Sequence, residues 1–155
     1  MLIGVAGANY YARSTGTVFT TEDRDLFLPA IPRNELSAWR VCRELALELW
    51  CGDEPLGAPL DLVLAKAVVS RKALVRAEGE RLTIDLTLVM AGFEFEAVWR
   101  NRRRFRVRGV SIPVARLTDI VASKAAAGRP KDRLFLATHE EALRDLIIPR
   151  PRRRS

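Results

Sequence analysis

Apolar and polar residues along the chain follow short patterns that predict a mixture of strands and helices. Residues 2–6 form an apolar run that predicts a buried strand, Gly7 breaks it, and residues 8–13 favour a short helix. A later alternation of polar and apolar residues predicts a strand in which Asp23 and Asp25 share one face. The pattern therefore places two carboxylates close together near the start of the chain.

The middle of the chain predicts a long helix and a β-hairpin. Residues 32–50 favour a helix, whereas residues 61–70 fit a helix or a strand equally well. Two further strands are expected over residues 73–77 and 82–89, joined by a glycine-containing turn. The second of them alternates cleanly, and Asp85 falls on its polar face, opposite a row of leucine and isoleucine residues.

The last third of the chain predicts three helices and a second hairpin. A short helix is expected over residues 92–100, a hairpin over 105–114, and longer helices over 115–127 and from 132 to about 146. Lys124 falls on the apolar face of the helix expected over residues 115–127. A lysine there either extends past the edge of the core into solvent or points at an anion.

These elements predict one α+β domain, a mixed sheet flanked by helices, over residues 2–147. A length of 155 residues with 48% hydrophobic content can bury a core, and we expect residues 148–155 to be a disordered basic tail. No apolar run is long enough for a membrane span, and the first residues lack the basic start of a signal peptide. Cys42 and Cys51 form no metal-like cluster, so we expect reduced thiols in a cytoplasmic protein.

Positive charge is concentrated in two short stretches of the chain. Lysine and arginine number 26 against 19 aspartates and glutamates, which gives a net charge of +7. The first stretch holds Arg100, Arg102, Arg103, Arg104, Arg106 and Arg108, and the second holds Arg150, Arg152, Arg153 and Arg154. A basic surface favours a polyanion such as RNA or a nucleotide, and the alternative is a surface that only keeps the protein soluble.

The three strand aspartates suggest chemistry on a phosphate. Asp23, Asp25 and Asp85 would offer oxygen ligands to Mg²⁺, which commonly shares its coordination sphere with substrate phosphates. Lys124 and Arg129 could contact a triphosphate. A strand, a glycine and a helix in succession can also cradle a phosphate, although many such glycines only tighten a turn. The simpler alternative for the aspartates is a solvated strand end.

Four segments taken together resemble a known enzyme superfamily. They are Gly7-Ala8, the run Thr-Glu-Asp-Arg-Asp-Leu at residues 21–26, Asp85 in a hairpin strand, and residues 117–132 with Lys124 followed by Arg-Pro-Lys-Asp. The pattern is similar to nucleotidyltransferases of the DNA polymerase β type. Within them it resembles small bacterial members that include abortive-infection and toxin–antitoxin toxins. The resemblance extends from residue 2 to about 146 and implies the nucleotidyltransferase fold.

The resemblance implies a role for each matching residue. Asp23, Asp25 and Asp85 would bind the metal, Mg²⁺ or Mn²⁺, and Asp85 could also act as base on the acceptor hydroxyl. Asp132 would help to build the site. The residues expected to contact the nucleotide are Gly7, Ala8, Thr21, Lys124 and Arg129.

The implied reaction is metal-dependent transfer of a nucleoside monophosphate from an NTP to an RNA end, such as that of tRNA, or to a protein hydroxyl. An antitoxin protein would be a natural partner. Ala8 stands where the family normally has a second glycine or a serine, and the gap from Gly7 to Asp23 is longer than usual. These departures leave two alternatives open: a degenerate module that binds nucleotide, RNA or a protein without catalysis, and a domain whose aspartates are merely solvated.

Overall fold

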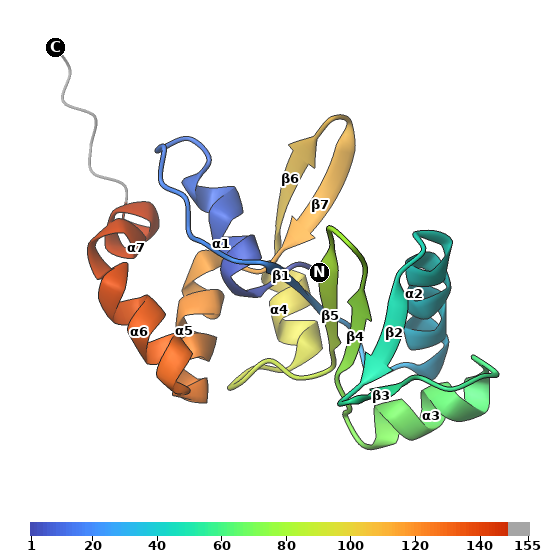
Figure 1. Cartoon of the computed structure of the whole chain (residues 1–155). Helices are drawn as coiled ribbons and strands as arrows, with labels where there is room; N and C mark the ends of the chain where they lie inside the picture. The colour runs from blue at the N-terminus through green and yellow to red at the C-terminus, as the bar shows by residue number, and fades with distance from the viewer. Residues whose placement is uncertain (149–155) are drawn as a thin grey trace, which may run out of the picture.

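Five strands form a mixed sheet in the computed structural model, which describes residues 1–148 (Figure 1). Across the sheet the order is β1-β5-β4-β2-β3. β1 is parallel to β5, and the other neighbours are antiparallel. The strands are β1 Asp23–Phe27, β2 Glu48–Cys51, β3 Glu54–Pro55, β4 Val75–Glu78 and β5 Thr83–Thr87.

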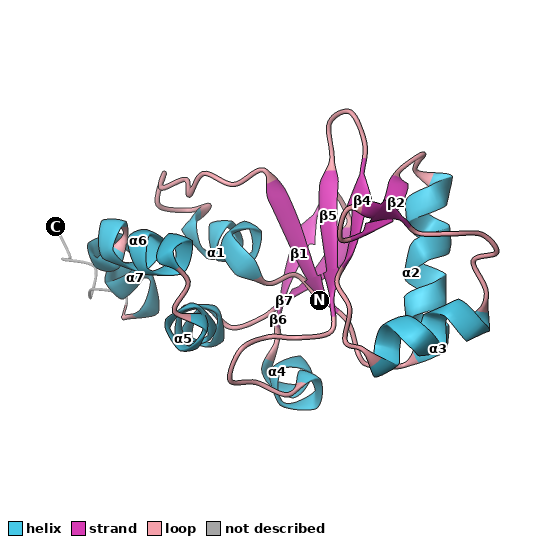
Figure 2. Cartoon of the chain, turned by 60° about the horizontal axis from the view of Figure 1, so that its bottom comes forward, coloured by secondary structure: helices cyan, strands magenta, loops and turns pink. Residues whose placement is uncertain are grey.

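Seven helices and a separate two-stranded hairpin complete the described part of the chain, so the α+β prediction is confirmed. The helices are α1 Gly4–Ala12, α2 Pro32–Glu44, α3 Leu62–Ser70, α4 Phe95–Asn101, α5 Leu117–Ala127, α6 Pro130–Thr138 and α7 Glu140–Ile147. The hairpin is β6 Arg103–Val107 with β7 Val110–Val114. Helices α2 and α3 lie on one side of the sheet, and α1 with α5–α7 lie beyond β1 (Figure 2).

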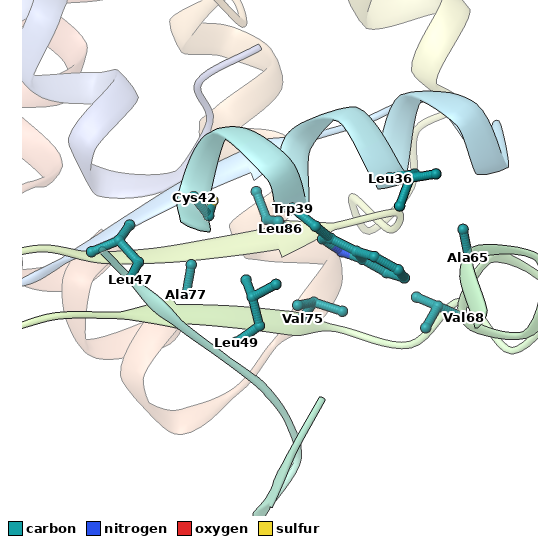
Figure 3. Packing of buried hydrophobic residues seen from close by; sticks show 10 residues of the cluster. All are labelled: Leu36, Trp39, Cys42, Leu47, Leu49, Ala65, Val68, Val75, Ala77 and Leu86. Atoms are coloured by element: carbon teal, nitrogen blue, oxygen red, sulfur yellow. The ribbon is translucent and has the colours of Figure 1, made fainter. Parts of the chain in front are cut away.

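One face of the sheet is apolar and packs against α2 and α3. Trp39 of α2 is fully buried and lies between the sheet and α3, near Val75, Val68 and Ala65 (Figure 3). Every second residue of β4 and β5 turns to this face because strand side chains alternate. The remaining buried members of this cluster are Leu36, Cys42, Leu47, Leu49, Ala77 and Leu86.

The opposite side of the sheet meets the helical layer through smaller apolar clusters. Phe27 at the end of β1 packs with Ile120 of α5 and Val98 of α4. Phe19 packs with Leu117 and Leu143, which joins α5 to α7. Asp23 and Asp25 of β1 and Asp85 of β5 lie on the same face of the sheet as Phe27. Beside these residues the sheet and the helical layer are separated by a cleft.

The predicted strand at residues 2–6 is wrong beyond its first residues. The backbone N–H of Ile3 donates to the carbonyl of Asp25 over 2.9 Å, and Leu2 bridges Leu26. At Gly4, however, φ is +64°, and the chain turns into α1. Glycine adopts that backbone conformation without strain. Gly4 therefore ends the extended segment, although the apolar residues continue after it.

Two predicted helices have different bounds. The helix expected over residues 32–50 ends at Glu44, because Ala46 adopts a φ of +57° and the next residues form β2. The helix expected from residue 132 is divided into α6 and α7 at His139. In both places the backbone leaves the helical conformation, although the apolar pattern of the sequence continues past that point.

The remaining elements largely agree with their predictions. Both hairpins are confirmed, and Gly128 ends α5 with a φ of +60°. The ambiguous segment 61–70 is a helix, since the Asp61 carboxylate accepts a hydrogen bond from the Leu64 N–H over 2.9 Å and caps it. No helix within residues 1–148 has the length and apolar character needed to cross a membrane. Disorder is predicted for residues 148–155, and all of these except residue 148 lie outside the described residues.

The fold predicts a stability effect at the buried pair in α2. The Trp39 indole N–H donates to Glu35 Oε1 over 3.0 Å, and both side chains are fully buried. We expect Trp39→Phe to lower the free energy of unfolding by roughly 1–3 kcal/mol, because it leaves a buried carboxyl without its donor. Denaturant titration measures this, with Arg40→Ala on the exposed side of α2 as control. A loss no larger than that of the control would contradict the role of the pair.

Candidate active site

The polar face of the sheet carries a row of three charged residues in register. Asp25 of β1 is paired with Asp85 of β5, and Asp85 is paired with Arg76 of β4. Neighbouring strands are about 4.8 Å apart, so residues in register on one face place their side chains together. Asp23 lies two residues before Asp25 and shares its face. The prediction that Asp23, Asp25 and Asp85 share one site is therefore supported by the strand register.

Arg76 binds this acidic cluster directly. Its Nε and Nη2 donate to Asp85 Oδ1 and Oδ2 over 2.8 and 2.9 Å, and Nη2 is 3.8 Å from Asp23 Oδ2. Only 10% of the Asp85 side chain is exposed, against 43% of Arg76. The hydrogen bonds to Asp85 come first among the causes that raise the pKa of Arg76 above its usual value. Asp85 thus has both of its oxygens engaged by one guanidinium group.

Asp25 is held against the first turn of α1. A Cβ placed on Gly4 would overlap Asp25 Oδ2, so only glycine allows the carboxylate this position. Burial, followed by the charge of Asp85, raises the pKa of Asp25, and the charge of Lys124 opposes that rise. The charge of Asp85 acts on Asp25 in this way because the two residues are in register on neighbouring strands.

A second charged group is built where α5 meets α6. Lys124 Nζ donates to Asp132 Oδ1 over 3.0 Å, and Arg129 Nε donates to Asp132 Oδ2 over 2.6 Å. The Asp132 side chain is fully buried, and that of Lys124 is 13% exposed. Burial alone would raise the pKa of Asp132, but the two cations outweigh it and hold the pKa below its usual value. The Lys124 ammonium also lies 5.1 Å from the centre of the Phe135 ring.

Both charged groups line one cleft of about 930 Å³ between the sheet and the α5–α6 layer. One wall is acidic and belongs to β1 and β5. The other is formed by α5, α6 and the turn between them, and it carries Lys124, Arg129 and Lys131. The residues predicted for the site that line the cleft are Thr21, Asp23, Asp25, Asp85, Lys124, Arg129 and Asp132. A cleft with opposed acidic and basic walls suits a ligand that carries both phosphates and a bound cation.

The predicted phosphate turn at Gly7 and Ala8 is wrong. Both residues lie inside α1, Ala8 is fully buried, and neither lines the cleft. A Cβ on Gly7 would lie 3.0 Å from Ile120 Cδ1, so Gly7 allows α1 to pack closely against α5. Gly4, three residues earlier, is the glycine that lines the cleft and borders Asp25.

The three aspartates have the right ligand atoms for a divalent cation, but their side chains are not positioned to bind one. Carboxylate oxygens are the ligands that Mg²⁺ prefers, and the repulsion at Asp25 is what a cation would relieve. Yet both oxygens of Asp85 are engaged by Arg76, and within residues 1–148 no three His, Cys, Asp or Glu side chains are arranged to hold a metal ion. The predicted metal site is therefore not formed while Arg76 binds Asp85.

Sequence reasoning missed Gly4 and Arg76 as site residues. Arg76 could have been found, because it lies on the predicted hairpin strand that pairs with Asp85. Gly4 gave no such signal, since its apolar neighbours resemble a continuous strand.

Most of the arginine-rich stretch is presented on the β6–β7 hairpin, which projects from the domain (Figure 1), whereas Arg100 lies in α4 and Arg102 directly follows it. Arg104, Arg106 and Arg108 are exposed, whereas Phe105 turns inward and packs on the rings of Tyr10 and Tyr11. Arg102 lies over the Trp99 ring, 3.9 Å from its centre. The hairpin is thus anchored by its aromatic residue and exposes arginines on its other face.

No known family model matches this sequence, and a search of the curated proteins finds no match.

The approach of Gly4 to Asp25 predicts an unequal effect of two alanine substitutions. Gly4 and Gly16 both have a positive φ, but only Gly4 has an atom within 4 Å of a built Cβ. Each variant should lose about 1 kcal/mol of unfolding free energy from backbone strain, and Gly4→Ala should lose more because it displaces the Asp25 carboxylate. Denaturant titration of both variants measures the difference, and equal losses would contradict the contact.

Asp132 predicts a stability effect that depends on pH. Removal of its charge leaves Lys124 and Arg129 unpaired, so Asp132→Asn should lower the unfolding free energy by roughly 3–5 kcal/mol at neutral pH. Because the folded-state pKa of Asp132 lies below the unfolded value of 3.8, this stabilisation is complete above about pH 5 and is lost as the pH falls through the folded-state pKa.

Unfolding measured between roughly pH 3 and 7 tests this, with Asp53→Asn in an exposed turn as control. The gap between the wild-type protein and Asp132→Asn should narrow at the acid end. A gap that stays constant with pH would show that the ion pairs do not set the stability.

Proposed function

We propose that this chain is a nucleotidyltransferase that binds an NTP in the cleft between the sheet and α5–α6. The observation that supports the proposal most is the in-register pair Asp25 and Asp85 facing the Lys124 side of the same cleft. These residues lie far apart in the sequence, and their types match those that the resemblance implies. The nucleotidyltransferase fold is part of the same proposal.

The basic wall offers contacts for a triphosphate. Lys131 of this wall is exposed, and Arg129 is 59% exposed although it binds Asp132. Lys72, which precedes β4, is a further exposed cation in the lining of the cleft. Lys124 is held by Asp132, so it has a fixed position from which its remaining N–H groups can donate. The Lys124 side chain thus points at the buried Asp132 carboxylate and not into solvent, and in the proposed complex it would share its ammonium group between Asp132 and a phosphate.

The proposed reaction is an in-line displacement at the α-phosphorus of the NTP. An acceptor hydroxyl forms a new P–O bond to the α-phosphorus, the bond from that phosphorus to the bridging oxygen breaks, and pyrophosphate leaves with the electron pair. The hydroxyl proton passes to a carboxylate, for which the resemblance implies Asp85. Asp85 can accept it only when Arg76 has moved away, because both oxygens otherwise accept hydrogen bonds. Bound Mg²⁺ would supply the neutralisation of phosphate charge.

The acceptor we propose is an RNA end such as that of tRNA, with a protein hydroxyl as the alternative. Exposed arginines on the β6–β7 hairpin support the RNA acceptor, since guanidinium groups bind backbone phosphates. Action as the toxin of a pair, with an antitoxin as partner, belongs to the same proposal. The two cysteines are unpaired thiols, which fits the cytoplasm as the place of action.

A degenerate module that binds nucleotide without transferring it is the second candidate. One observation favours it: Arg76 engages the residue expected to serve as third metal ligand and base. In such a module the cleft would still accept a phosphate ligand through its basic wall, and catalysis would be absent.

Label transfer from an α-labelled NTP to bulk tRNA or to protein, with Mg²⁺ or Mn²⁺, tests the first candidate. We expect Asp25→Asn to reduce transfer by at least about 100-fold, because it removes half of the in-register acidic pair. Glu22→Gln, exposed and outside the cleft lining, is the matched control and should keep wild-type transfer.

Binding measurements separate the two candidates. Absence of transfer with all four NTPs, together with nucleotide binding that persists in Asp85→Asn, would favour the degenerate module. Absence of both transfer and a nucleotide-dependent thermal shift would rule out both.

A further inference from the structure

We infer that Arg76 is the built-in counter-ion of the acidic cluster and that a divalent cation binds these carboxylates only when Arg76 leaves Asp85. The inference concerns the site of the proposed function and rests on it for the idea that a cation is required there. It adds a residue that controls when the site can accept one.

The first support is the geometry of the contact. The planar fork of Arg76 meets both oxygens of Asp85 at 2.8 and 2.9 Å and reaches within 3.8 Å of Asp23. A bidentate pair of this kind occupies the oxygen directions that a metal ion would use. Arg76 therefore lies between two of the three predicted metal ligands.

The second support is charge. Within the cleft the acidic wall carries Asp23, Asp25 and Asp85, and Arg76 is the cation that contacts two of them. A guanidinium group cannot be deprotonated in a protein, so it would repel a divalent ion bound to the same oxygens. Occupancy by Arg76 and occupancy by a metal ion at Asp85 therefore exclude each other.

The third support is that Arg76 is able to move. Its side chain is 43% exposed and lines the cleft, whereas the apolar neighbours of its strand, Val75 and Ala77, are fully buried on the opposite face. Rotation of the side chain would break its polar contacts without opening the core. A triphosphate in the cleft would offer the released guanidinium a new anionic partner.

This arrangement couples the two ligands. Without nucleotide, a metal ion must displace Arg76 with no compensation, so its binding is weak. With nucleotide, the phosphates receive both the metal ion and Arg76, so binding of each favours the other. The acidic cluster would thus remain closed to free divalent cations.

The inference is tested by measuring the affinity of the full chain for Mn²⁺ alone, by isothermal titration calorimetry. We expect weak binding in the wild-type protein and binding tighter by at least about 10-fold in Arg76→Gln, because a positive charge at contact distance is removed. Arg24→Gln is the charge-matched control: Arg24 lies on the other face of β1 and is exposed, so its loss should leave the affinity unchanged. Asp85→Asn added to Arg76→Gln should abolish the gain.

Several results would overturn the inference. The first is an Mn²⁺ affinity of Arg76→Gln equal to that of the wild-type protein or of Arg24→Gln. The second is no Mn²⁺ binding by the wild-type protein or by Arg76→Gln. The third is a gain in Mn²⁺ affinity that persists when Asp85→Asn is added. Should Arg76→Gln fail to fold, Arg76→Lys keeps the charge but loses the bidentate contact, and we expect an intermediate gain from it. Lack of nucleotidyl transfer with a normal gain in Mn²⁺ affinity would refute the proposed enzyme and leave the role of Arg76 intact.

Discussion

The parallel pairing of β1 with β5 is the constraint on which the site depends. It places Asp25 directly beside Asp85, and like charges side by side destabilise a sheet unless something compensates them. Two compensations are visible: the guanidinium of Arg76 on Asp85, and the positive charge of Lys124 near Asp25. Paired carboxylates of this kind are more common at functional sites than elsewhere, and the proposed function would give them a role.

Local patterns in the sequence predicted most elements of the fold but not where all of them begin and end. Both hairpins, the strand at Asp23 and the helix that ends at Gly128 follow from alternation and from glycine chemistry, which act within a few residues. The early turn into α1 could not be predicted, because it depends on the close approach of Gly4 to Asp25, a contact between separate elements.

The same difference between local patterns and contacts of separate elements applies to the site. The three aspartates and Lys124 were recognisable as residue types at positions where polar groups are disfavoured. The partner of Lys124 was not: Asp132 was expected to help build the site, but its full burial between two cations follows only from the packing of α5 on α6. Strand pairing likewise decides that Arg76 contacts Asp85, and no pattern in one segment reports the register of another.

The spacing of these contacts along the chain bears on the order in which the site assembles during folding. Arg76 and Asp85 are nine residues apart in one hairpin, and Lys124 and Asp132 are eight apart at one helix junction. Each pair can form early, because closing a short loop costs little entropy. The acidic wall is complete only when β1 joins β5, and the two walls meet only when the helical layer docks. Both are long-range events. Asp85 and Asp132 would thus each have a cationic partner before the whole cleft exists.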